Sequence, residues 1–246
     1  MAIAENPPAP AADSDFAEMW DRVGRIAGWL TRDQAYDLWS AARTLARGST
    51  IIEIGSHQGR STVALARAAS GSGATVVAVD PFVDGAMLGG QKTRDLFERH
   101  IAIAGVGDRV RLEADYSVRV RANWTGPVDL LYIDGKHDYW SCSKDLGWVS
   151  YMADGASVFV HDAFSSLGVT ASLVREQLRR FPRIRYRRRT GSLAAFVVGA
   201  PTARERMCLM SELPWFCRNL AIKLLLRLRL RPLVRAMGHD SPYDPF

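Results

Sequence analysis

The chain has 246 residues, of which 48% are hydrophobic and 24% charged, and its formal net charge is +6 at pH 7. This length and composition allow one sizeable core, so we expect one main domain with terminal extensions. The sequence has no uninterrupted apolar run of about 18 residues and no basic, apolar signal peptide at its start, which predicts a cytoplasmic protein. Its three cysteines lack any C-x-x-C spacing, which argues against a disulfide framework or a zinc site.

The excess positive charge is concentrated in two stretches, residues 175–189 and 218–235. Neither stretch is accompanied by an RNA-binding signature or an aromatic platform, so nucleic acid is disfavoured as a partner. The charge by itself indicates a weak preference for anionic partners.

The N-terminal region is predicted to contain a disordered leader and two helices. Residues 1–14 are rich in Pro and Ala and lack the apolar pattern that would repay the entropy of ordering them. Helical patterns follow at 16–30 and 35–45, and between them Thr31 and Gln34 have the spacing of a capping box.

From residue 50 onward, short and continuous apolar runs alternate with helical stretches. The runs are typical of buried parallel strands, and they cover residues 49–55, 74–80, 110–115, 128–134 and 156–162. Crossover helices are expected near 61–69, 91–104, 142–152 and 169–181. Residues 183–189 and 193–198 flank a T-G-S turn and predict a closing antiparallel hairpin. Together these elements predict a doubly wound α/β domain with a mostly parallel, seven-stranded sheet, over residues 15–200.

A different pattern begins after Pro201, so residues 201–246 are expected to form a helical extension outside the sheet. Lys223, Arg227 and Arg231 recur at four-residue spacing among leucines, which predicts a basic amphipathic helix. Such a helix can lie on an anionic membrane surface, which would place the protein at the inner membrane face. Packing on the domain, or on a second copy in a homo-oligomer, is left open, because Arg229 interrupts the polar face.

The first predicted strand leads into the loop I-I-E-I-G-S-H-Q-G-R-S-T. Gly55 and Gly59 allow the backbone to turn tightly and approach a ligand. They do not have the close spacing of the G-x-G-x-x-G fingerprint, so a nicotinamide cofactor is disfavoured. The second strand ends at Asp80, where a carboxylate can accept hydrogen bonds from both hydroxyls of a ribose.

These residues resemble the first motif, E/D-x-G-x-x-x-G, and the acidic second-strand end of the class I methyltransferases. The resemblance implies the fold of that class and S-adenosylmethionine as cofactor, with its methionine portion over the first loop and its ribose on Asp80. On the adenine side, after the third strand, either Asp115 or Tyr116 can be aligned with the family position. The cofactor-binding residues that we expect are Glu53, Gly55, Ser56, Gly59, Ser61, Asp80 and Asp115.

Polar side chains are dense after the fourth and fifth predicted strands. Asp134 and His137 lie in L-L-Y-I-D-G-K-H-D-Y-W, and His161 and Asp162 follow in S-V-F-V-H-D-A. The two carboxylates would share one edge of the sheet, where they repel each other unless a cation or a proton lies between them. A hard divalent cation such as Mg²⁺ suits oxygen ligands.

The segment I-D-G-x-H-x-Y resembles the metal-dependent macrocin and mycinamicin type of sugar O-methyltransferase, over roughly residues 48–165. The resemblance implies that Asp134 and Asp162 bind the metal and that His137 is the general base. An imidazole has an ordinary pKa of about 6.5, which suits that role. His161 stands where that group has a second carboxylate; as a third ligand it would favour a softer ion, so Mn²⁺ remains an alternative to Mg²⁺.

The leading hypothesis is therefore a metal-assisted O-methyltransferase that uses S-adenosylmethionine. Its acceptor would be a small molecule or glycan, specifically a hydroxyl of a sugar or of a glycosylated natural product. One alternative keeps the fold without chemistry and binds anionic lipid or nucleic acid through the basic tail. Another is an N-methyltransferase, against which the absence of an N-P-P-Y type motif argues.

Overall fold

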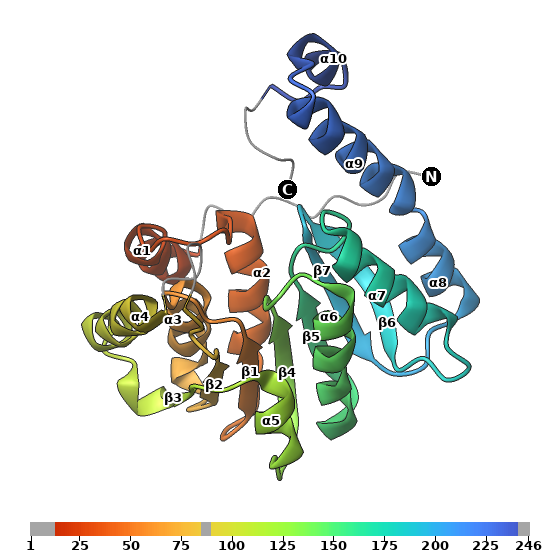
Figure 1. The fold of residues 1–246 in the computed structure, drawn as a ribbon. Coiled ribbons are helices and arrows are strands. Elements are labelled where there is room, and N and C mark those ends of the chain that lie inside the picture. Colours follow the sequence, from red (N-terminus) through yellow and green to blue (C-terminus); the bar gives the residue numbers. More distant parts are fainter. Residues whose placement is uncertain (1–12, 85–89, 241–246) are drawn as a thin grey trace.

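The computed structural model describes residues 13–84 and 90–240, and it contains the predicted α/β sheet (Figure 1). The strand order is β3-β2-β1-β4-β5-β7-β6, and all neighbouring pairs among β1 to β5 are parallel. Strand β7 is antiparallel to both β5 and β6. The strands are β1 (Thr50–Ile54), β2 (Thr75–Val79), β3 (Val110–Glu113), β4 (Val128–Ile133), β5 (Met152–Val160), β6 (Ile184–Thr190) and β7 (Leu193–Val198). The predicted strands and hairpin are thus confirmed.

Helices cover both faces of the sheet, which explains why the central strands are apolar on both sides. Successive residues of a strand enter different cores: Ile51 packs in one hydrophobic cluster and Ile52 in the other. The connecting helices are α3 (Arg60–Ala68), α4 (Gly90–Ala104), α5 (Ser117–Ala122), α6 (Tyr139–Asp145) and α7 (Leu167–Leu178). In Figure 1, α3 and α4 lie on the opposite side of the sheet from α6 and α7.

Two N-terminal helices precede the sheet, as expected, but the first is shorter than the predicted 16–30. Helix α1 (Ser14–Val23) ends at Gly24, and α2 (Arg32–Arg43) begins with the predicted capping box of Thr31 and Gln34. Residues 1–12 of the predicted leader lie outside the described residues. Of its last two residues, Ser14 is the first residue of α1, and Asp13 caps the helix by accepting a hydrogen bond from the Phe16 backbone.

The C-terminal extension forms α8 (Ala203–Met210), α9 (Leu213–Arg227) and α10 (Arg231–Ala236). The prediction of a single basic helix that continues through Arg231 is therefore wrong. Arg229 has a φ of +59°, and Pro232 lies in the first turn of α10. A left-handed residue ends a helix and a proline suits the start of the next one. Within the described ranges, no helix is long and apolar enough to cross a membrane.

Candidate active site

The loop after β1 approaches the end of β4 so closely that a side chain would not fit between them. Gly55 has a φ of +90°, and a Cβ atom there would lie 2.2 Å from the carbonyl oxygen of Asp134. Gly59 has a φ of +88° and forms the N-cap of α3, where a Cβ atom would lie 3.2 Å from the Phe97 ring. The positive φ angles and the close neighbouring atoms therefore explain why both positions are glycine.

Glu53 lies beneath this loop and is completely buried. Burial raises the pKa of its carboxyl to about 7, although the neighbouring hydroxyls of Ser61, Thr62 and Ser56 partly offset the effect. Within the described residues, Glu53 Oε1 and the Ser56 hydroxyl are buried without a hydrogen-bond partner. Buried polar atoms are rarely left unpaired, so these two groups are available to a bound ligand or to water.

Asp80 follows β2 and is half-buried. Its two carboxylate oxygens accept hydrogen bonds from the backbone N–H groups of His57, at 2.9 Å, and Phe82, at 2.8 Å. Both donor residues have positive φ angles, +45° and +43°. Because a carboxylate oxygen can accept more than one hydrogen bond, Asp80 remains able to bind ribose hydroxyls while the two turns fix its position.

Asp115 lies just beyond β3, at the same edge of the sheet. Its carboxylate accepts a hydrogen bond from the Tyr116 backbone and is 3.3 Å from Arg119, which belongs to the helix that follows. The Tyr116 side chain is half-exposed beside it. Asp115 and Tyr116 both lie at the end of β3, so both remain candidates for the contact with adenine.

The ends of β4 and β5 bring together the four polar residues predicted there. His137 Nδ1 lies 2.9 Å from an Asp162 oxygen, and His137 Nε2 lies 3.4 Å from Asp134 Oδ1. His161 is buried, and its Nδ1 lies 3.2 Å from the same Asp134 oxygen and 3.7 Å from Asp162. Asp162 has a φ of +53°, a strained conformation for a residue with a side chain. We call these four residues the histidine–aspartate cluster.

The cluster favours the protonated form of its histidines. Burial lowers the pKa of the His137 imidazole, but hydrogen bonds to Asp134 and Asp162 outweigh it and raise the pKa to about 10. The pKa of His161 is also raised, since Asp134 outweighs the effect of burial. For Asp134 and Asp162, burial raises the pKa, but the two imidazoles outweigh it and hold both values below their usual range. The pKa of His137 therefore departs from the ordinary imidazole value near 6.5, because the ring lies between two carboxylates.

The donor atoms of the cluster are compatible with a divalent cation, although no three of them are arranged as ligands around one point. No group of three or more His, Cys, Asp or Glu side chains in residues 13–84 and 90–240 has the arrangement of a metal site. However, His161 Nδ1 is a buried atom without a hydrogen-bond partner and lies between the two carboxylates. The two aspartates carry two negative charges when ionised, a charge that a divalent cation would neutralise.

Two residues that the sequence did not single out for the site hold this cluster in place. The Tyr132 hydroxyl donates to Asp134 Oδ2 at 2.9 Å, and the Gln34 amide oxygen lies 3.2 Å from His161 Nε2. Tyr132 could have been found, because residues two apart on a strand point to the same face. Gln34 could not, since it belongs to α2, 127 residues before His161.

Arg60 is a further residue that the sequence analysis missed. Its guanidinium donates to the backbone carbonyls of Gly24, Ile26 and Leu30, and thereby ties the segment between α1 and α2 to the start of α3. This segment carries Trp29, whose half-exposed ring lies 5.4 Å from the ring of His57. An aromatic side chain is thus held beside the predicted cofactor loop.

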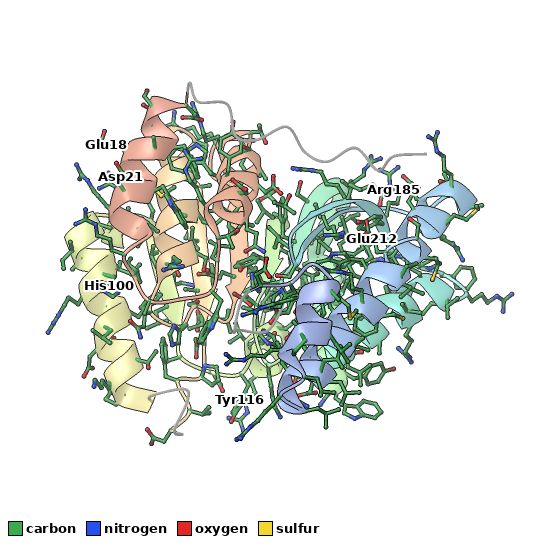
Figure 2. The ribbon with its side chains drawn as sticks, turned by 90° about the horizontal axis from the view of Figure 1, so that it is seen from above. Glu18, Asp21, His100, Tyr116, Arg185 and Glu212 are labelled. Carbon is green, nitrogen blue, oxygen red and sulfur yellow. The ribbon has the colours of Figure 1, made fainter. Side chains whose placement is uncertain are left out.

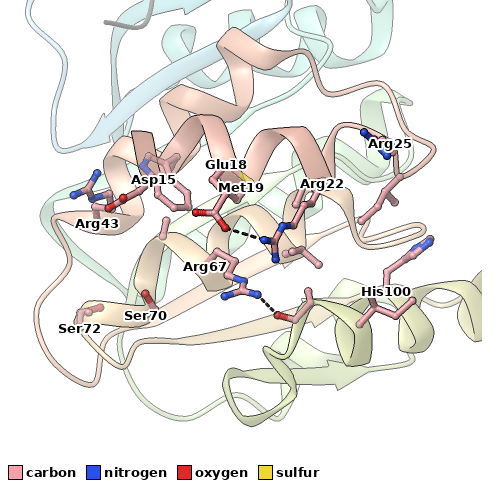
Figure 3. Close-up of a pocket in the computed structure, with 18 residues that line it drawn as sticks. Asp15, Glu18, Met19, Arg22, Arg25, Arg43, Arg67, Ser70, Ser72 and His100 are labelled. Atoms are coloured by element: carbon pink, nitrogen blue, oxygen red, sulfur yellow. Dashed lines mark hydrogen bonds and ion pairs between the residues drawn. The ribbon is translucent and has the colours of Figure 1, made fainter. Parts of the chain in front are cut away.

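A large cavity lies elsewhere in the molecule. Its volume is about 870 Å³, and residues of α1, α3 and α4 line it, including Met19, Arg67 and His100 (Figure 3). Seen from above in Figure 2, Glu18 and His100 lie on the opposite side of the molecule from Arg185 and Glu212. This cavity does not include the strand-end residues, so we do not assign the cofactor to it.

Comparison with known proteins identifies the same part of the chain, the parallel strands and their carboxyl ends, as a methyltransferase domain. Residues 52–163 match a family model described as a methyltransferase domain, a span that begins within β1, continues through β5 and includes the histidine–aspartate cluster. That span contains all of the predicted site residues.

Several solved structures share the fold at low sequence identity. A cofactor-bound protein, Rv0187 from MTB, is 20% identical with a TM-score of 0.58, over 80% of this chain and 98% of that one. An O-methyltransferase from Bacillus cereus, in complex with SAH, is 20% identical with a TM-score of 0.55, over 77% and 93% of the two chains. TomG, an O-methyltransferase of tomaymycin synthesis from Streptomyces achromogenes in complex with SAM, is 17% identical with a TM-score of 0.55, over 76% and 91%. The chain therefore has the class I methyltransferase fold, and its residues 52–163 match a methyltransferase domain.

Proposed function

We propose that this protein is an S-adenosylmethionine-dependent O-methyltransferase. The observation that carries the proposal is the contact between Gly55 and the Asp134 backbone, which places the cofactor loop directly against the histidine–aspartate cluster. Similar folds are described as O-methyltransferases with SAM or SAH bound, which supports the same donor here.

In this proposal the donor lies across the ends of β1 and β2. Its ribose hydroxyls donate to Asp80, whose carboxylate is already oriented by two backbone N–H groups. Its methionine portion lies over the loop from Gly55 to Gly59, near the unpaired Ser56 hydroxyl. This arrangement directs the methyl group toward the end of β4.

The acceptor hydroxyl would then lie between the methyl group and the cluster. Its oxygen forms a bond to the methyl carbon while the carbon–sulfur bond breaks, and the hydroxyl proton is transferred to a base. We assign that role to His137, whose Nδ1 is oriented by Asp162. Because the aspartates favour a protonated ring, His137 can act as a base only after its extra proton has been released.

A divalent cation held by Asp134 and Asp162, with His161 as third ligand, would favour that release by neutralising the two carboxylates. When bound, such a cation also lowers the pKa of a coordinated hydroxyl. We propose Mg²⁺, with Mn²⁺ as the alternative that an imidazole ligand favours. The resemblance of I-D-G-x-H-x-Y to the macrocin type favours a sugar or glycosylated natural product as acceptor.

Two binding experiments test this proposal. Isothermal titration with S-adenosylhomocysteine should show binding to the intact protein, and absence of binding would reject the methyltransferase assignment. Titration with Mg²⁺ and Mn²⁺ should show binding that Asp134→Asn weakens, because an amide is a poorer ligand than a carboxylate. Asp154→Asn, an exposed aspartate on β5, is the matched control.

The outcomes separate the cofactor assignment from the metal assignment. If S-adenosylhomocysteine binds but neither metal binds, the protein is a methyltransferase that neutralises its aspartates with imidazole protons. If Asp134→Asn and Asp154→Asn bind metal equally, the cation does not lie at the cluster. In both cases the donor site remains as proposed.

A further inference from the structure

The end of the C-terminal extension exposes leucines and arginines on the same short segment. In residues 224–235, which we call the leucine–arginine segment, Leu224 and Leu228 are each 58% exposed and Leu233 is 53% exposed. Exposed residues also include Arg227, Arg229, Arg231 and Arg235. Clustered apolar side chains on a surface commonly mark a contact site.

The segment is also strongly basic. Residues 224–235 contain four Arg residues and no Asp or Glu. Across residues 13–84 and 90–240, no salt bridge pairs any of the four arginines of the segment with a carboxylate. These charges are therefore available to a partner.

The extension is firmly attached to the domain just before this segment. Glu212 is buried and accepts hydrogen bonds from Tyr186 and Arg189 of the β6–β7 hairpin. Further along, the Asn219 amide donates to the Phe164 carbonyl, and Lys223 Nζ donates to the Ser165 carbonyl at 2.8 Å. The leucine–arginine segment thus projects from a fixed base, as Figure 1 shows for α9 and α10.

We propose that the leucine–arginine segment docks the protein on an anionic lipid surface. The arginines would contact lipid phosphates while the leucines between them enter the boundary of the acyl chains, a combination typical of interfacial segments. A nucleic acid would pair with the arginines but would leave the leucines exposed, and the segment has no aromatic side chain for base stacking. A second copy of the same segment would bring like charges together.

The attachment of α9 gives the docking a defined orientation. Phe164 and Ser165, which bind α9, follow directly after His161 and Asp162. A membrane contact at the segment therefore lies on the side of the molecule where the histidine–aspartate cluster opens. The docking does not depend on methyl transfer, so it can be tested without a known acceptor.

Vesicle co-sedimentation with the full chain tests the proposal. Three preparations would be compared: the native protein, Arg227→Glu/Arg229→Glu/Arg231→Glu, and Leu224→Ser/Leu228→Ser/Leu233→Ser. The matched control is Arg25→Glu/Arg47→Glu/Arg99→Glu, which changes three other exposed arginines by the same charge. Each variant is first checked for an unchanged melting temperature, and single substitutions replace any triple variant that unfolds.

We expect the native protein to bind phosphatidylcholine vesicles that contain phosphatidylglycerol at least about tenfold more tightly than vesicles of phosphatidylcholine alone, with binding weakened by salt. Both segment variants should lose most of this binding, and the control should keep it. The proposal is overturned if the native protein does not sediment, if the control loses binding equally, or if the leucine variant binds normally. It is also overturned if an oligonucleotide displaces the vesicles, or if the segment variants change a dimer into a monomer without affecting vesicle binding.

Discussion

The two halves of the proposed site are built in different ways. On the donor side, backbone atoms position the important groups: Gly55 contacts a carbonyl, and Asp80 is held by two N–H groups. On the acceptor side, side chains from distant elements hold one another, as in the contact of His161 with Gln34. The donor side should therefore be sensitive to backbone conformation, and the acceptor side to the charge of individual groups.

Gly55→Ala should have the largest effect of any single substitution in the site. The added Cβ atom would lie 2.2 Å from the Asp134 carbonyl oxygen, at a φ of +90°. We expect a loss of stability of about 3 kcal/mol or more, together with loss of S-adenosylhomocysteine binding. Thermal unfolding and isothermal titration would measure both effects.

Gly73→Ala is the control for that change, since Gly73 also has a positive φ, +63°, but a Cβ atom added there would meet no atom within 4 Å. It should cost about 1 kcal/mol and leave cofactor binding intact. If Gly55→Ala and Gly73→Ala changed stability and S-adenosylhomocysteine binding equally, the close approach of the β1 loop to the end of β4 would not be needed for either property.

His137→Ala should reduce turnover while leaving the donor side intact. Loss of a general base lowers the rate by about 10²–10⁴-fold, with partial recovery at high pH, where the acceptor hydroxyl ionises without help. Methyl transfer from labelled donor would measure the rate, and Lys136→Ala, an exposed neighbour, is the control. Full activity of His137→Ala, combined with an inactive His161→Ala that still binds metal, would assign the base to the other strand.

The stability of the metal-free protein should depend on pH through the same residue. The pKa of His137 is raised from 6.5 to about 10 in the folded state, so the stabilisation is fully present below pH 6.5 and is lost as the pH rises toward 10. In EDTA, the melting temperature of the native protein should exceed that of His137→Ala most at low pH. A difference that grows with pH would contradict the charge assignment of the cluster.

Asp80→Ala should weaken S-adenosylhomocysteine binding by about 1.5–3 kcal/mol, the value of a lost charge-assisted hydrogen bond. Asp80→Asn keeps one oxygen for the backbone N–H groups, so its affinity for S-adenosylhomocysteine should lie between that of Asp80→Ala and that of the native protein.

Asp115→Ala should have the smallest effect on S-adenosylhomocysteine binding, about 1 kcal/mol or less, because the Asp115 carboxylate already contacts Arg119 and the Tyr116 backbone. If Asp80→Ala and Asp115→Ala lost similar affinity for S-adenosylhomocysteine, the ribose would have to be assigned to a position closer to β3.

The strands and the donor loop could be predicted from the sequence because their signals are local. Runs such as A-T-V-V-A-V-D report burial on both faces, and a glycine spacing reports a tight turn. The protonation of His137 could not be predicted, since it depends on a carboxylate from β4 and another from the end of β5. The same limit applies to Arg60, which looked like an ordinary helix residue but joins three carbonyls of an earlier segment.

The C-terminal extension shows a related limit. Spacing alone indicated one basic helix, but Arg229 and Pro232 divide it into α9 and α10. The sequence also could not show that Glu212, an acidic residue between uncharged neighbours, is buried against Tyr186 and Arg189. Both features depend on tertiary contacts that periodicity does not record.

The position of β7 in the sheet has a consequence for how the chain folds. This strand is the last in the sequence, yet it lies between β5 and β6. As the chain is synthesised, the edge of β5 must therefore remain unpaired until residues 193–198 have emerged, and unpaired edges invite association with other chains. Strand insertion at this late stage is also a non-local step, which slows folding. Refolding from denaturant should accordingly show a phase in which β1 to β5 are protected from hydrogen exchange before the amides of β6 and β7 are.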